Sequence, residues 1–316
     1  MKSVKSIQNQ SFKNIEIIIV DDGSTDNSST KYKILLDTDP RIRIFYHYNN
    51  LGLWRTRLDG FLYSRSKFIL FFDAGDFYED NYVLEDYYNI IEKYNLDSFK
   101  MIFRLIKSYS SINFSRIPFH AYHNPKIVYG TENIENLNTK IFDGWGNIWN
   151  RIIRANIFTK SLDLVNDKVL NIYYNKAEDL WYNIMINKVS YSFLVIERVG
   201  YVYYYDRQGE GTPHFDTEVQ RNKAIQNQIT HMYYEHNFLP KNDSKKQIIQ
   251  KLHEYKDGKS EYQLNFFKSK FYLINDLINI LLKDSYVEKD DKIFLNKLLN
   301  ESYTRENKIK SLRNSI

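Results

Sequence analysis

Ile15-Glu16-Ile17-Ile18-Ile19-Val20-Asp21-Asp22-Gly23-Ser24 is the most informative stretch of the sequence. Its first six residues are large and mostly β-branched, with Glu16 as the one charged side chain. A short apolar run of this kind predicts a strand that is buried in a parallel sheet. The two aspartates and the glycine that follow predict a loop at the carboxyl end of the strand. Thr25 to Ser28 then offer N-cap oxygens for a helix.

The same pattern recurs over the next fifty residues. Arg41 to Tyr46 alternates like a half-buried strand, Leu53 to Ser66 fits a helix, and Lys67 to Phe72 is a second apolar run that leads into Asp73-Ala74-Gly75-Asp76. Alternating strands and helices predict an α/β fold with a mostly parallel sheet. Ligands of such folds bind beyond the carboxyl ends of the strands, so both acidic loops are expected to face one crevice.

The remainder of the chain predicts further helices and strands, then a change of character near residue 212. We expect a domain over residues 1–212 and a helical appendage over residues 213–316. In the first domain we expect a helix over 81–94, a strand over 99–106, an irregular segment over 107–142, an aromatic stretch leading into a helix over 144–158, a helix over 176–188 and paired strands over 191–205. In the appendage, helical spacing of apolar residues covers 217–236, 244–255, 260–284 and 290–312.

Composition excludes several classes of protein. None of the 316 residues is a cysteine, which rules out disulfides, thiolate metal sites and cysteine nucleophiles. The net charge of +5 lacks the clustering typical of a nucleic-acid binder, so no nucleic-acid partner is expected. No apolar run approaches the ~20 residues that span a bilayer, and the first ten residues lack a signal-peptide core, so we expect a cytoplasmic protein.

The two acidic loops offer ligand-binding chemistry. Asp21 and Asp22 can accept hydrogen bonds from a ribose or from a base N–H, although a plain capping loop is an alternative. Asp73 and Asp76 stand three positions apart in an open loop, which suits a hard divalent cation that also bridges to a diphosphate. The alternative there is a solvated turn.

Glu178-Asp179 and two arginines complete the candidate chemistry. Either acid can serve as a general base for an acceptor hydroxyl, or can simply favour the positive N-terminus of a helix. Arg57 and Arg207 can pair with diphosphate oxygens, although most single arginines only solubilise a surface.

Tryptophans are the candidates for sugar stacking. Trp145 and Trp149 can stack on a sugar ring, with core packing as the alternative. The sequence contains no nucleophile triad and no phosphate-cradling glycine-rich loop, so kinases and P-loop enzymes are excluded.

In chain order these motifs resemble the inverting family 2 glycosyltransferases. Residues 6–28 resemble the opening of that family, and the similarity reaches to about residue 212. It continues through Asn50-Leu51-Gly52 with Arg57, the DxD-like Phe71-Phe72-Asp73-Ala74-Gly75-Asp76, the acceptor-side segment Gly144 to Arg151, the acidic pair Glu178-Asp179 and Tyr203-Tyr204-Tyr205-Asp206-Arg207.

The resemblance implies a Rossmann-like GT-A domain that binds a nucleotide-diphospho-sugar, with UDP-sugar as the expected donor. Asp21 and Asp22 would contact uracil and ribose, Asp73 and Asp76 would lie beside Mn²⁺ or Mg²⁺, and Asp179 would be the base. The two arginines would hold diphosphate. The implied acceptor is a glycan or lipid-linked glycan of cell-surface polysaccharide or lipopolysaccharide, with peripheral membrane contact through the C-terminal helices.

The sequence departs from the family pattern in two places. Family members begin with an apolar strand that ends in a Pro-x-Tyr-Asn-like turn, whereas Met1 to Ser6 corresponds to the following helix, so the first strand is expected to be missing. Gly75 stands where the second aspartate of the DxD pattern is expected. A non-catalytic sugar-nucleotide or glycan-binding remnant is therefore the alternative. A nucleotidyltransferase is a weaker one, because its glycine-rich triphosphate loop is missing.

Overall fold

The computed structural model describes only part of the chain, and the statements below are limited to that part. The described residues are 2–106, 115–116, 127–135, 147–165, 170, 174–175, 178–204, 249–250, 252–253, 275, 278–279, 281–283 and 287–300. The chain divides into two compact units, Met1–Thr212 and Pro213–Ile316. Each unit is considered by itself.

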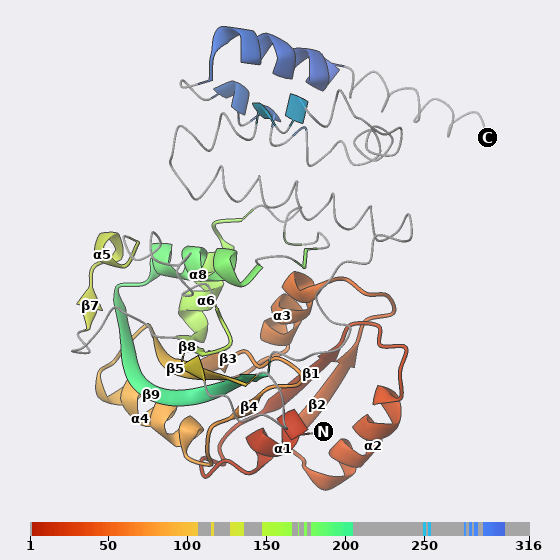
Figure 1. The fold of residues 1–316 in the computed structure, drawn as a ribbon, viewed down its shortest axis with the longest axis vertical. Coiled ribbons are helices and arrows are strands. Elements are labelled where there is room, and N and C mark those ends of the chain that lie inside the picture. Colours follow the sequence, from red (N-terminus) through yellow and green to blue (C-terminus); the bar gives the residue numbers. More distant parts are fainter. Residues whose placement is uncertain are drawn as a thin grey trace. The chain divides into compact units, whose positions relative to one another are not determined.

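The first unit opens with a helix and a two-stranded parallel sheet (Figure 1). Helix α1 (Lys2–Gln8) leads into strand β1 (Ile17–Asp21), and helix α2 (Ser28–Thr38) connects β1 to strand β2 (Ile42–Tyr46). Ile17 of β1 pairs with Ile42 of β2 in parallel register. The strand, helix and strand expected over residues 15–46 are therefore confirmed.

The second sheet follows helix α3 (Leu53–Leu62) and has the strand order β3-β8-β5-β9-β4. Strand β6 extends it by pairing with β5, and strand β7 by pairing with β9. The bounds are β3 (Phe68–Leu70), β4 (Phe77–Tyr78), β5 (Ser98–Ile106), β6 (Ser115–Arg116), β7 (Val128–Tyr129), β8 (Arg151–Arg154) and β9 (Ser192–Tyr204). The described helices around it are α4 (Val83–Lys93), α5 (Thr131–Glu135), α6 (Ala155–Leu162) and α8 (Glu178–Val189).

The α/β class is confirmed, and two details of the expected sheet are corrected. The second sheet is mixed, because only β5 and β9 pair in parallel and its other pairings are antiparallel. The segment expected as paired strands over 191–205 is the single strand β9, which β5 accompanies from Ser98 to Ile106. Strand β8 was not expected, because four residues that lead straight into a helix give no alternating pattern of useful length.

Strands β1 and β3 belong to different sheets, and within the described residues no backbone hydrogen bond joins them. Their first residues are nevertheless held near each other by the carboxylate of Glu16. Its Oε1 accepts hydrogen bonds from Ser64 Oγ (3.1 Å), Arg65 N (2.7 Å) and Ser66 Oγ (2.7 Å), directly before β3. A side chain thus connects two strand starts whose backbones are unpaired.

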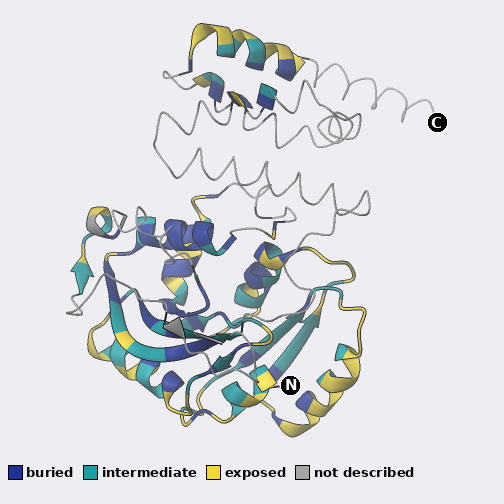
Figure 2. Ribbon diagram, viewed as in Figure 1, coloured by how far each residue is buried: buried dark blue, intermediate teal, exposed yellow. Residues whose placement is uncertain are grey.

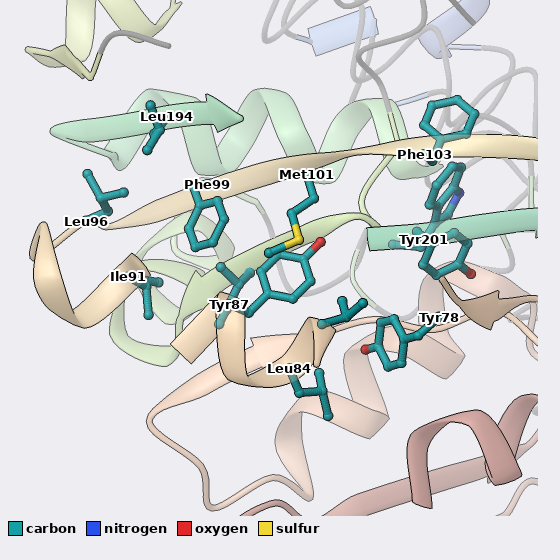
Figure 3. Close-up of a cluster of buried hydrophobic side chains, with 13 residues drawn as sticks. Tyr78, Leu84, Tyr87, Ile91, Leu96, Phe99, Met101, Phe103, Leu194 and Tyr201 are labelled. Carbon is teal, nitrogen blue, oxygen red and sulfur yellow. The ribbon is translucent and has the colours of Figure 1, made fainter. Parts of the chain in front are cut away.

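The main hydrophobic core lies between α4 and the second sheet (Figure 3). Successive side chains of a strand point to opposite faces, so Phe99, Met101 and Phe103 of β5 all turn toward α4. Tyr87 and Ile91 of α4 meet them and are at most 1% exposed. Each apolar side chain of this size contributes roughly 1.5–3 kcal/mol when fully buried.

Helices α6 and α8 pack on the opposite face of the second sheet (Figure 1). Nine of the twelve residues of α8 are buried, including its first residue, Glu178. Figure 2 shows this burial along the helix, in contrast to the exposed surface of α2. Burial on every side fixes the position of a helix, so a side chain at the start of α8 is held by the core.

The second unit is described only in short helical pieces. Residues 289–300 are helical, and Leu281, Leu295 and Leu298 are buried. Most of the four helical segments expected there lie outside the described residues. No helix in the described part of the chain combines the length and the apolar character that a membrane span requires.

Candidate active site

Helix α3 begins at the first acidic loop. Both oxygens of Asp22 accept backbone hydrogen bonds there, Oδ1 from Leu51 N (2.7 Å) and Oδ2 from Gly52 N (2.9 Å). Gly52 is the N-cap residue of α3, so the carboxylate lies at the positive end of the helix. Asp22 thereby joins the carboxyl end of β1 to the start of α3.

A histidine that the motifs did not indicate reinforces this junction. His47 Nδ1 lies 2.8 Å from Asp22 Oδ1, and its Nε2 lies 2.9 Å from Asp59 Oδ2. Asp59 also accepts a hydrogen bond from Arg55 Nε (2.7 Å). Gly23 permits the close approach of the loop, because its φ is +73° and a Cβ there would lie 2.9 Å from Asn50 N.

The adjacent Asp21 is buried and turns back on its own loop. Its Oδ1 accepts a hydrogen bond from Ser24 N at 2.8 Å. In the present arrangement both aspartates organise the loop, which is the capping alternative that their sequence position allowed. Their contacts with a uracil or a ribose remain a prediction.

Arg57, one turn further along α3, is the centre of the site. Its Nη2 donates to Asp73 Oδ1 at 2.8 Å, just past the end of β3. Its Nη1 donates to Glu178 Oε1 at 2.5 Å and lies 2.5 Å from Asp179 Oδ1 at the start of α8. Three segments that are far apart in the sequence therefore meet at one guanidinium group, which is only 7% exposed.

The charges at this cluster do not balance. Three carboxyl groups surround one guanidinium, so a proton or a second cation is needed for neutrality. Burial raises the pKa of Asp179 well above its usual value. The positive charge of Arg57 opposes that rise, and the neighbouring Glu178 and Asp73 add to it. The pKa of Arg57 is raised by the three acids, which outweigh its burial. Asp179 is thus a carboxyl group with enhanced basicity, as a general base needs.

The second acidic loop offers one open carboxylate. Asp73 keeps 20% of its side chain exposed, whereas Asp76 is fully buried and both of its oxygens accept hydrogen bonds from β9. Gly75 has a φ of +100°, a conformation that favours glycine. Within the described residues no cluster of three acidic or histidine side chains is arranged to hold a metal ion.

The aromatic and arginine candidates fall into two groups. Trp149 is 5% exposed and its ring stacks on Tyr201 (4.4 Å between ring centroids) and Tyr203 (5.5 Å). Both faces of its ring are therefore covered by the core, so the expectation that Trp149 stacks on a sugar is not met by this arrangement. Trp145 and Arg207 lie outside the described residues.

Three buried polar residues near the site were not indicated by any motif. Lys100 Nζ donates to Asn147 O at 2.7 Å, and burial lowers the pKa of Lys100 well below its usual value. Arg151 is fully buried and burial lowers its pKa to about 9. Tyr201 bonds the second acidic loop. All three sit in strands that read as apolar, and only a lysine or arginine inside an apolar run could have marked them.

Comparison with known proteins agrees with this arrangement. The family described as "Glycosyl transferase family 2" matches residues 2–158. An uncharacterized glycosyltransferase of Haemophilus influenzae is 37% identical over 76 residues, covering 24% of this chain and 30% of that protein. Glycosyltransferase GlyG of Streptococcus pneumoniae is 32% identical over 93 residues, covering 29% and 31%. The matched region thus spans under a third of these relatives.

Solved structures share the fold at low identity. The crystal structure of S. aureus TarS 1–349 has a TM-score of 0.54 and 13% sequence identity, and the match covers 100% of this chain and 87% of that one. TarS 1–349 in complex with UDP also has a TM-score of 0.54, with 14% identity over 100% and 87% of the two chains. From the matched family, the relatives and the shared fold, the chain belongs to the family 2 glycosyltransferases, with a Rossmann-like GT-A fold.

Proposed function

We propose that this protein transfers a sugar from a nucleotide-diphosphate donor to a hydroxyl group of a glycan acceptor, with inversion at the anomeric carbon. One observation supports this most strongly. Arg57 gathers Asp73, Glu178 and Asp179 into a single acidic cluster beyond the ends of the strands. A site of this kind needs a base for the acceptor and a way to stabilise a departing diphosphate, and the cluster offers residues for both tasks.

In the proposed reaction Asp179 acts as the general base. The acceptor oxygen forms a bond to the anomeric carbon while the bond from that carbon to the diphosphate oxygen breaks. The acceptor's proton passes to the Asp179 carboxylate, and the nucleoside diphosphate leaves with the bonding electrons. One direct displacement inverts the anomeric configuration. Glu178 and Arg57 position the base, since both touch it or its partner within the buried cluster.

A divalent cation, Mn²⁺ or Mg²⁺, fits this site with a single protein carboxylate. Asp73 would hold it, since Asp73 is partly exposed and the surplus of negative charge at Arg57 favours a cation. Mg²⁺ commonly takes one or two carboxylates and completes its shell with phosphates and water. When bound, the cation would stabilise the developing charge on the leaving diphosphate. Asp76 does not fit as a ligand, because its oxygens are buried and occupied.

UDP-sugars are the donors to test first. TarS 1–349, which shares the fold, was also crystallised with UDP-GlcNAc (TM-score 0.52, 14% identity, covering 95% of this chain and 84% of that one). A curated relative in Campylobacter jejuni, 37% identical over 76 residues, is a GalNAc(5)-diNAcBac-PP-undecaprenol beta-1,3-glucosyltransferase. That name supports a lipid-linked glycan as the acceptor class. Membrane contact of the C-terminal unit remains a prediction, since most of that unit lies outside the described residues.

The proposal is tested by nucleotide binding. Isothermal titration with UDP, GDP and dTDP, each with and without Mn²⁺, should give saturable binding of UDP that depends on the metal. Asp73→Asn should weaken the metal-dependent part by about tenfold or more. Asp163→Asn is the matched control, because Asp163 is exposed at the end of α6, away from the cluster. A folded wild-type protein that binds none of the three nucleotides would refute the proposal.

A non-catalytic sugar-nucleotide or glycan-binding protein is the second candidate. It is favoured by the unpaired edges of β1 and β3 and by the single open carboxylate of the second acidic loop. This candidate predicts nucleotide binding without any release of UDP from UDP-sugars. Turnover therefore separates the two functions.

A further inference from the structure

Asp76 follows β3 by only a few residues, and its carboxylate is sealed in the protein. The residue is 0% exposed. Its Oδ2 accepts a hydrogen bond from Tyr201 Oη at 2.7 Å, and its Oδ1 accepts one from Tyr204 N at 2.9 Å. A ligand of a catalytic cation has to present an oxygen to the open site, and both oxygens of Asp76 instead face β9.

Tyr201 passes this contact on to Asp73. Its hydroxyl oxygen accepts a hydrogen bond from Asp73 N at 3.1 Å while its proton goes to Asp76. Burial raises the pKa of Tyr201, so the hydroxyl keeps its proton and remains a donor. The ring is fixed as well, because Trp149 stacks on it at 4.4 Å and Phe72 packs against it at 5.1 Å.

The same carboxylate also fixes the far end of β9. Strands β4 and β9 pair through Phe77 with Val202 and Tyr78 with Tyr201, directly beside Asp76. The bond from Tyr204 N to Asp76 continues this attachment past the short ladder. Asp76 thus joins the loop that carries Asp73 to the strand end from which the chain continues toward Arg207.

We propose that Asp76 is a positioning residue, which holds the Asp73 backbone through the Tyr201 hydroxyl and the end of β9 through Tyr204, and is not itself a ligand of the cation. This inference rests on the proposed function, since it assigns Asp73 as the carboxylate that meets the donor and its metal. It divides the acidic loop into one residue that binds and one that sets the binding geometry. Groups that orient a metal ligand affect affinity nearly as much as the ligand does.

Asparagine distinguishes the two roles at position 76. In Asp76→Asn the side chain keeps an acceptor oxygen for Tyr204 N–H and offers an amide donor to the Tyr201 oxygen, which still accepts from Asp73 N. A neutral amide oxygen is a much poorer ligand for a hard cation than a carboxylate. Positioning is therefore preserved by asparagine, while metal ligation is not.

The experiment is titration of UDP with increasing Mn²⁺ into the full-length wild type and into Asp73→Asn, Asp76→Asn, Asp76→Ala and Tyr201→Phe. We expect Asp76→Asn to bind within about threefold of wild type, and Asp73→Asn and Asp76→Ala to lose about tenfold or more. Tyr201→Phe, which keeps the ring and removes the link, should lose part of the Mn²⁺-dependent affinity. Thermal unfolding of each variant without nucleotide identifies any that do not fold, and the asparagine and phenylalanine variants decide the case if the alanine variant unfolds.

The outcomes separate this inference from the proposed function. If wild type binds UDP with Mn²⁺ and Asp76→Asn loses the metal dependence as fully as Asp73→Asn does, Asp76 is a ligand and the inference is overturned. Wild-type affinity in Tyr201→Phe would overturn it too, because the link to Asp73 would then be without effect. A folded wild type that binds no UDP contradicts the proposed function itself.

Discussion

At the scale of single residues, the site is organised by one buried cation among three acids. Arg57 is held by Asp73, Glu178 and Asp179, and an isolated guanidinium could not be buried at this depth without such partners. The arrangement leaves Asp179 with a raised pKa. It also means that Arg57 is fully engaged before any donor arrives, so its first role is to hold the catalytic acids together.

The pH dependence of turnover follows from this cluster. Because burial and the neighbouring acids raise the pKa of Asp179, the rate should rise with pH until that carboxyl group is ionised. Removing the negative charge of Glu178 removes one cause of the raised pKa. In Glu178→Gln the acidic limb of the pH–rate profile should therefore move to lower pH. Profiles measured with saturating donor check the direction, and a limb that stays in place or moves upward would contradict the assignment.

At the scale of the elements, α8 is attached to the second sheet by a buried arginine. Arg151 of β8 donates from Nε (3.1 Å) and Nη2 (2.7 Å) to Ser98 Oγ of β5, and from Nη1 (2.8 Å) to Asn183 Oδ1 of α8. Asn183 in turn donates to the carbonyl oxygen of Asp179 at 2.9 Å. The guanidinium lies 4.8 Å from the ring centre of Phe193. Strand, helix and base are thus connected in one chain of contacts.

Arg151→Met should destabilise the protein by about 2 kcal/mol, because Ser98 and Asn183 lose a buried partner. The loss is limited because burying the charge was itself unfavourable. The matched control is Lys67→Met, which breaks an exposed pair with Glu92 and should cost within ~0.5 kcal/mol. Urea denaturation measures both. Equal effects in the two variants would show that the buried network contributes nothing particular.

Much of the first domain follows from local sequence, and the rest depends on contacts between distant segments. Strands β1 and β2 and the acidic pair at Glu178-Asp179 follow from apolar patterns and familiar motifs. The burial of Asp76 does not, because a carboxylate in a loop reads the same whether it faces solvent or Tyr201. The single strand β9 was misread as a pair because its apolar run is interrupted by Glu197, Arg198 and Gly200.

At the scale of the whole molecule, the first unit is built from two sheets with unpaired facing strands. Glu16 fixes the starts of β1 and β3 near each other, and Ile7 of α1 packs against the hydrophobic clusters of both sheets. Side chains therefore connect the two sheets where the backbone does not. Ile18 and Val20 of β1 and Phe68 and Leu70 of β3 are only half-buried, although their sequences predict fully buried strands.

Amide hydrogen exchange tests this division of the sheet. Ile17 N donates to Arg41 O at 2.9 Å, and because neighbouring N–H groups of a strand point to opposite edges, Ile18 and Val20 direct theirs away from β2. Their amides should exchange on the order of tenfold faster than those of Ile17 and Ile19. Equal protection at all four positions would mean that β1 is paired along both edges.

The most direct test of the central claim is the release of UDP from UDP-sugar donors in the presence of Mn²⁺ and a glycan acceptor. Wild type is compared with Asp179→Asn and with the exposed control Asp163→Asn. We predict turnover in wild type and in the control, and a loss of about 100-fold or more in Asp179→Asn with UDP affinity nearly unchanged. Turnover that is the same in Asp179→Asn and wild type would contradict the account, because no base would then act at the centre of the acidic cluster.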